Sequence, residues 1–249
     1  CYVKVHQCLP YHWAEVWVSE LGYFQRHDIA SLQDGIASIN LGHHGKSCPS
    51  RHASNVNFIL VASNGIHSTK IRFCQCNGAE RWEKLMENRL FPSTVAQPTS
   101  AFTFGVLHQY HLQHLTSKAS VHDFAASLLM LTDNVYHFRV PDMAPQLRMV
   151  MRIWRLLVAT KRLGQGHNIS AELPHLRELI VHCPSCLDPH LNGEEGWDQT
   201  SHEFRYTQFT ADGNHHSNRY LKNTDPDDIS LFEGKAYFPE DGEYKEYVK

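Results

Sequence analysis

The chain has 249 residues, enough for one large domain or two ordinary ones, and 42% of them are hydrophobic against 20% charged. This composition is typical of a folded globular protein and argues against a disordered chain. The net charge of −3 excludes a uniformly basic surface, so any contact with nucleic acid has to be local.

No signal peptide is visible, and no apolar run reaches the ~18–20 residues of a membrane helix. We therefore expect an intracellular protein, in the nucleus or the cytosol, with no membrane partner. Because the chain begins at Cys1 and not at Met, a fragment or a processed product is also expected.

The first half of the chain predicts a short turn-rich segment followed by a hairpin and a helix. Residues 1–50 contain closely spaced glycines and prolines and no long periodic run. Residues 56–62 predict a buried strand, and Asn64-Gly65 predicts a turn into a second strand over 66–76. Residues 79–89 predict a short amphipathic helix, which the Phe91-Pro92 step ends.

The middle of the chain predicts three helices, over residues 103–118, 121–133 and 144–163, after a loop at 94–100. The third is the clearest, because one side of it is apolar and the other side is basic. Residues 187–201 then predict a polar linker, and residues 204–210 alternate like a new strand. The whole indicates an α+β fold.

Cysteines and histidines occur in short spacings that suit zinc, whose preferred ligands are thiolate and imidazole. Two close pairs, Cys74-Gln-Cys76 and Cys183-Pro-Ser-Cys186, can make one four-cysteine site that staples distant parts of the chain. The alternative is two pairs of buried thiols, which are common core residues. An odd total of seven cysteines, without a secretory signal, favours metal binding over disulfides.

Two further groups of potential ligands are present. His43, Cys48 and His67 could build a second site, although a single histidine is more often a surface or core residue. At the N-terminus, Cys1, His6 and His12 offer one ligand fewer than a closed structural site needs, and Cys8 fits no pair.

The basic side of the third helix is a candidate for contact with nucleic-acid phosphates. Residues 139–162 hold six basic residues against one acidic residue. The candidates at helical spacing are Arg148, Arg152, Arg155, Lys161 and Arg162. A solvated helix face with no ligand is the alternative.

Asp212 follows the expected strand over 204–210, within Asp212-Gly-Asn214. An ordinary Asp-Gly turn explains it locally. A carboxylate at a strand end can also hold a catalytic metal, but two-metal chemistry needs several carboxylates. Asp225, Asp227 and Asp228 lie nearby, in what reads as an acidic loop. An autonomous metal-dependent nuclease would need at least two of them to converge on Asp212.

The order of these motifs resembles a known family. The series runs from Pro10-Tyr-His12 through Leu41-Gly-His43, Asn64-Gly-Ile-His67 and Phe73-Cys-Gln-Cys76 to Cys183-Pro-Ser-Cys186 and Gly196-Trp197. It resembles the CxC-type cysteine-cluster domain associated with Kyakuja-Dileera-Zisupton (KDZ) transposases, which are abundant in mushroom-forming fungi. The likeness covers about residues 1–200, and residues 201–249 look like the opening of the transposase itself.

The resemblance implies a zinc-stabilised module joined to the start of an RNase H-like domain. Zinc would be structural, and DNA would be the main partner, with protein partners or self-association as the alternative. Asp212 would be the first acidic residue of a magnesium-dependent core whose other acidic residues lie beyond Lys249. We therefore expect this chain not to cleave or join DNA by itself.

Overall fold

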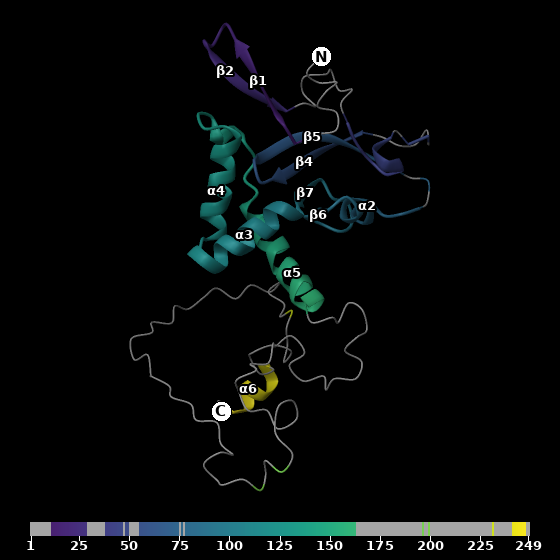
Figure 1. Cartoon of the computed structure of the whole chain (residues 1–249), viewed down its shortest axis with the longest axis vertical. Coiled ribbons are helices and arrows are strands. Elements are labelled where there is room, and N and C mark those ends of the chain that lie inside the picture. Colours follow the sequence, from purple (N-terminus) through teal and green to yellow (C-terminus); the bar gives the residue numbers. More distant parts are fainter. Residues whose placement is uncertain are drawn as a thin grey trace. The chain divides into compact units, whose positions relative to one another are not determined.

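The structure is a computed structural model. It describes residues 11–28, 38–46, 48–49, 55–74, 76, 78–162 and 241–247, together with 196, 199 and 231. The chain divides into two units, Cys1–Arg155 and Leu156–Lys249. Nearly all the described elements belong to the first unit (Figure 1), and the second contributes the end of one long helix and the short helix α6, Asp241–Tyr247.

A two-stranded hairpin opens the described chain. Strand β1, Trp13–Val18, pairs antiparallel with β2, Tyr23–Asp28, so that Trp17 stands opposite Phe24 and Trp13 opposite Asp28. Hydrophobic residues occur on both sides of β1, without the one-sided alternation that identifies a strand in a sequence. The sequence predicted a turn-rich segment here and did not reveal the two strands.

The first unit is built on a five-stranded mixed sheet in the order β3-β5-β4-β7-β6. Its central hairpin consists of β4, Asn55–Ala62, and β5, Gly65–Phe73, which pair antiparallel around the turn at Asn64. Strand β3, Ile39–Leu41, lies parallel to β5, and β7, Ser100–Thr103, lies parallel to β4. The edge strand β6, Leu90–Pro92, completes the sheet against β7.

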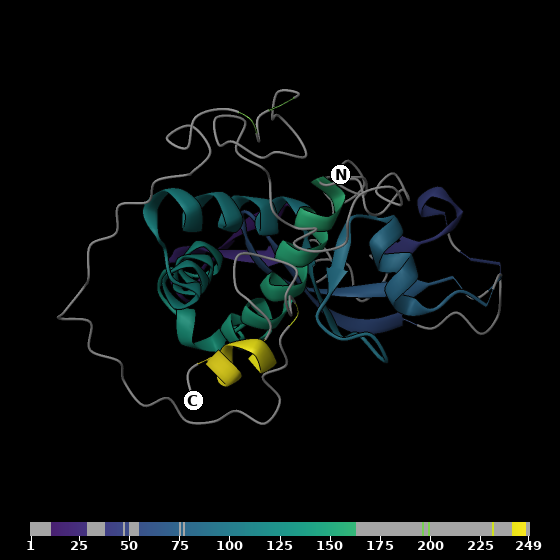
Figure 2. The same ribbon diagram turned by 90° about the horizontal axis from the view of Figure 1, so that it is seen from below.

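Helices cover the sheet on both faces. Helices α3, Phe104–Ser117, α4, Val121–Thr132, and α5, Ala144–Arg162, gather on one side of the strands (Figure 2). Their buried residues share a core with Val61 and Phe102 of the sheet. Helix α2, Arg81–Glu87, contributes Leu85 to a second core around Phe58 and Leu60 on the opposite face.

The alternation of β4 explains this division. Successive side chains of a strand point to opposite faces, so Leu60 joins one core and Val61 the other. Both are fully buried. A strand covered on both faces is a continuous apolar run, which is why residues 56–62 were recognisable from the sequence.

The mixed α+β class is confirmed. The three predicted helices correspond to α3, α4 and α5, and the predicted hairpin corresponds to β4 and β5. The short strands β3, β6 and β7 were not predicted, because three or four residues give too little periodicity. The expected strand over 204–210 lies outside the described residues, and of the expected RNase H-like segment 201–249 the structure describes only 231 and 241–247.

Candidate metal centre

Two neighbouring strands deliver the cysteine cluster to one edge of the sheet. Strand β3 ends at Leu41, which stands opposite Phe73, the last residue of β5. Because the two strands are parallel, both chains leave the sheet at the same edge, and the Cys74 amide donates a hydrogen bond to the Leu41 carbonyl at 3.0 Å. The chain after β3 carries His43 and Cys48, and the chain after β5 carries Cys74 and Cys76.

These four residues converge. Their ligand atoms, one imidazole nitrogen and three sulfurs, all lie within 4.8 Å of one another. The Cys48 sulfur lies 3.8 Å from that of Cys74 and 3.4 Å from that of Cys76. The Nε2 atom of His43 lies 3.1 Å from the Cys74 sulfur and 3.4 Å from the Cys76 sulfur.

The separations suit a tetrahedral metal. Zinc bonds of about 2.3 Å to sulfur and about 2.0 Å to nitrogen place tetrahedral ligand atoms about 3.5–3.8 Å apart. A disulfide would need sulfurs about 2.05 Å apart, and all three cysteines are free thiols. The arrangement therefore fits one zinc ion with a Cys₃His ligand set better than it fits any pairing of the cysteines.

The backbone around His43 is shaped for close approach to Cys74. Gly42 has a φ of 114°, and a Cβ atom built on it would lie 2.5 Å from the Cys74 Cβ. Any side chain would collide there, so only glycine lets the loop after β3 come this near to the end of β5. His43 itself holds a left-handed φ of 47°, which is uncommon for a residue with a side chain.

The cluster is buried on one side and open on the other. Cys48 and Cys74 are buried, whereas His43 and Cys76 are exposed. Hydrogen bonding to the thiols of Cys48 and Cys74, reinforced by desolvation, raises the pKa of Cys76 to about 11. Without a metal this thiol keeps its proton at neutral pH, and a bound cation would have to displace it.

A nearby ammonium and an amide would support thiolate charge. Lys84 of α2 bonds Glu87, and this bond is the main reason that the lysine pKa is raised; the charge of Cys74 contributes in the same direction. The Cys76 amide points at the Cys74 sulfur, 3.4 Å away. Such contacts around the ligands stabilise the deprotonated form of a metal-bound thiol.

The grouping differs from the one that the sequence suggested. His43 and Cys48 join Cys74 and Cys76 in one cluster of four, where the sequence paired Cys74 and Cys76 with Cys183 and Cys186. The latter pair lies outside the described residues, as do Cys1 and His6. The signal that could have revealed the grouping is the parallel pairing of β3 with β5, which a three-residue strand does not disclose.

His67 is not in this cluster. Its side chain is 1% exposed, and both ring nitrogens already have partners, Asp28 Oδ1 at 2.8 Å and Asn64 Oδ1 at 3.0 Å. Neither nitrogen is therefore available to bind a metal together with His43 and Cys48. His12 is exposed and also takes no part in the cluster.

The basic residues of α5 lie along a helix whose other side is buried. Leu147, Val150 and Met151 are in the helical core. Arg148, Lys161 and Arg162 are exposed, and Arg152 and Arg155 are half-buried. Asp212 lies outside the described residues.

Comparison with known proteins identifies the segment that carries the cluster. Residues 32–136 match the family described as CxC2 like cysteine cluster associated with KDZ transposases. This segment is a CxC2-like cysteine cluster. It contains all four converging residues and the whole five-stranded sheet, whereas the β1–β2 hairpin and α5 lie outside the match.

No curated protein and no solved structure matches the chain. Among the helices of the described part, none is long and apolar enough to cross a membrane.

Proposed function

We propose that the CxC2-like segment is a structural zinc module of a transposase-derived protein and that the basic side of α5 binds DNA. The observation that supports the zinc site is the convergence of His43, Cys48, Cys74 and Cys76 at tetrahedral separations. Four protein ligands fill the coordination sphere of zinc, so no position remains for a substrate or a reactive water. Zinc then fastens β3 to the end of β5 and takes no part in chemistry.

The DNA-binding part of the proposal depends on α5. Arg148, Arg152, Arg155 and Arg162 recur at helical spacing, so they share one side of the helix. The packing of Leu147 and Val150 fixes the helix on the sheet and leaves the arginines Arg148 and Arg162 exposed. The guanidinium group of arginine matches phosphate oxygens in geometry and charge, so a row of arginines can bind successive phosphates of a nucleic-acid backbone.

The test is the salt dependence of binding to a random-sequence duplex. The zinc-loaded chain should bind with an affinity that falls steeply as salt rises, because each neutralised phosphate releases counterions. The double variant Arg148→Gln, Arg162→Gln should reduce the slope of log K against log salt by about 2. Lys118→Gln with Arg89→Gln, which removes the same charge elsewhere, should leave the slope unchanged.

An affinity that is undetectable, or one that does not respond to salt, would count against DNA binding. Equal effects of both double variants would indicate attraction by overall charge and would argue against a site on α5.

A zinc-dependent protein-interaction module is the second candidate, and an apolar stripe on α5 favours it. Met149, Ile153 and Leu157 recur every four residues and are 54%, 43% and 45% exposed. Exposed apolar side chains at this spacing are typical of a helix that packs against a partner. In this case partner binding would survive Arg152→Ala with Arg155→Ala and would be lost in Ile153→Asp.

We further propose the division expected from the sequence, with the cysteine-cluster domain at 1–200 and the start of an RNase H-like domain at 201–249. The resemblance of Asp212-Gly-Asn214 to a transposase element supports this division. Magnesium would bind only in a complete core, so the chain should leave plasmid DNA intact in the presence of Mg²⁺. Nicking that Asp212→Ala abolishes would contradict this expectation.

A further inference from the structure

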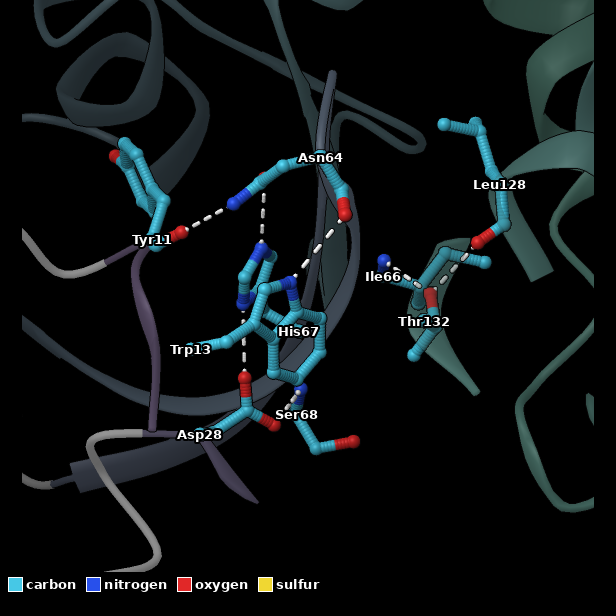
Figure 3. A network of polar contacts seen from close by, with 9 residues as sticks. All are labelled: Tyr11, Trp13, Asp28, Asn64, Ile66, His67, Ser68, Leu128 and Thr132. Carbon is cyan, nitrogen blue, oxygen red and sulfur yellow. Dashed lines mark hydrogen bonds and ion pairs between the residues drawn. The ribbon is translucent and has the colours of Figure 1, made fainter. Parts of the chain in front are cut away.

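His67 lies at the junction between the β1–β2 hairpin and the central sheet. It belongs to β5, and its ring is stacked under Trp13 of β1 with the two centroids 4.2 Å apart (Figure 3). Asp28, the last residue of β2, faces the ring from the other strand of the hairpin. A buried imidazole therefore contacts both strands of the hairpin, which forms a two-stranded sheet of its own beside the five-stranded sheet.

Both nitrogens of the ring face oxygen atoms. Nδ1 lies 2.8 Å from Asp28 Oδ1, and Nε2 lies 3.0 Å from Asn64 Oδ1. A neutral imidazole has one N–H and can donate only one of these hydrogen bonds, whereas an imidazolium donates both. With a neutral ring, the lone pair of one nitrogen would point at a lone pair of an oxygen inside a buried site.

The orientation of the Asn64 amide is fixed by a second contact. Its Nδ2 donates to the Tyr11 carbonyl at 2.6 Å, so rotating the amide would turn its oxygen toward another oxygen. The Asn64 carbonyl in turn accepts a hydrogen bond from Trp13 Nε1 at 3.3 Å. The atom that faces His67 Nε2 is therefore the amide oxygen of Asn64, which can only accept a hydrogen bond.

The surroundings supply the opposite charge. Asp28 is 14% exposed, and its second carboxylate oxygen accepts the Ser68 amide at 2.9 Å. Tyr11 also lies near the ring, and burial raises the pKa of its hydroxyl, which keeps it neutral. On the same hairpin Arg26 pairs with Glu15, and on the α4 side the uncharged Thr132 lies against Gly65 of the turn.

The turn under this junction is tied to α4, and polar contacts link the hairpin to the turn and to α4. The Thr132 hydroxyl accepts the Ile66 amide at 2.8 Å and donates to the Leu128 carbonyl at 2.7 Å, which fixes the β4–β5 turn to α4 (Figure 3). Beside it, a cavity of about 530 Å³ lies between the hairpin and the turn, lined by Trp13, Glu15, Arg26, Asn64 and Leu131. A two-stranded hairpin is marginal by itself, so its docking depends on the polar contacts around this cavity.

We propose that protonated His67 is a latch that fastens the β1–β2 hairpin to the β4–β5 turn and that loss of its proton releases the hairpin. The docked state holds one more proton than the released state, because a solvated histidine gives up its proton near pH 6.5. Docking is therefore favoured as pH falls and weakens as pH rises. Release would uncover His67, the ring of Trp13 and the side of the β4–β5 turn.

The first test measures the protonation state of His67, and a variant is needed only to assign its signal. Long-range ¹H–¹⁵N spectra of the full chain give the protonation state of each histidine ring, and the signal lost in His67→Gln belongs to His67. We expect two protonated nitrogens at about pH 6. A ring with a single N–H at that pH would overturn the proposal.

The second test measures docking. Hydrogen exchange of the 13–28 amides, corrected for the intrinsic effect of pH, should rise about tenfold relative to that of the α3 amides between about pH 6 and about pH 8.5. Asp28→Asn should abolish this pH dependence, and Glu15→Gln, on the same hairpin, should preserve it. Exchange that does not change with pH in the unaltered chain would overturn the proposal even if Asp28→Asn failed to fold.

Discussion

The two ends of the first unit are ordered by different means. On the helical side, Phe102, Leu107 and Tyr110 lie in a continuous apolar core. At the cysteine cluster the buried apolar group consists of Cys48 and Cys74. Burial of apolar surface can stabilise the first region without a ligand, whereas the second buries little of it and has four side chains that a metal could hold together. One sheet can thus carry a core that packing stabilises and an edge whose stability would come from a bound metal.

Removing a ligand should affect the cluster most and the helices least. A structural zinc contributes on the order of 10 kcal/mol, and Cys74→Ser should remove on the order of half of that zinc-linked stability. We expect fewer than one zinc per chain after dialysis, measured by atomic emission, and rapid hydrogen exchange at 38–49 and 74–76.

The unaltered chain treated with a chelator is the control and should behave in the same way. If the α3 and α4 amides lost protection to the same extent as the cluster, the separation between the two regions would be refuted.

The converse experiment truncates a buried side chain in the helical core. Leu107 is 0% exposed, and Leu107→Ala should lower the free energy of unfolding by about 2–5 kcal/mol through the lost burial and the cavity that remains. Chemical denaturation followed by far-ultraviolet circular dichroism measures this change. Zinc affinity should stay the same.

Leu115 provides a matched control, since it lies on the same helix and is 65% exposed. Leu115→Ala should change stability by less than about 0.5 kcal/mol. Weaker zinc binding in Leu107→Ala would indicate that the two regions are coupled.

The smallest effect should come from the glycine that lets the loop after β3 approach Cys74. Gly42→Ala introduces a Cβ 2.5 Å from the Cys74 Cβ at a φ of 114°, and strain of this kind costs about 1–3 kcal/mol. We expect zinc affinity to fall by about tenfold or more in competition titrations, with the helices unchanged.

Substitution of Gly45 provides a control that distinguishes backbone strain from steric collision as the cause of the lost zinc affinity. It has a φ of 83°, but a Cβ there would meet nothing within 4 Å. Gly45→Ala therefore carries the backbone strain without the collision and should reduce zinc affinity less. Equal losses in the two variants would mean that the approach of Gly42 to Cys74 is unimportant.

The sequence was informative where periodicity or local chemistry is strong. The apolar and basic sides of α5 were predicted correctly. The predicted turn lies one residue earlier than expected, at Ser63-Asn64, because Gly65 already pairs with Ala62. The β1–β2 hairpin was missed because its stability depends on docking. Its contacts with Asn64, His67 and Leu131 join residues far apart in the chain.

The candidate site shows the same division. That cysteines and histidines of this chain could bind zinc followed from residue types and spacing, and the order of the motifs pointed to the cysteine cluster associated with KDZ transposases. The sequence also singled out His67, but as a potential ligand. The structure assigns it to a polar network, since Asp28 and Asn64 occupy both of its nitrogens.

The sequence by itself therefore determined the types of ligand, the main hairpin and the three long helices, because each of these depends on neighbours within a few residues. Only the tertiary structure decided which ligands meet. The parallel pairing of β3 with β5 brings His43 within reach of Cys74, and that pairing depends on a non-local register and on the absence of a side chain at Gly42. A spacing pattern gives the candidates for a metal site, whereas the distances between them depend on how the strands are paired.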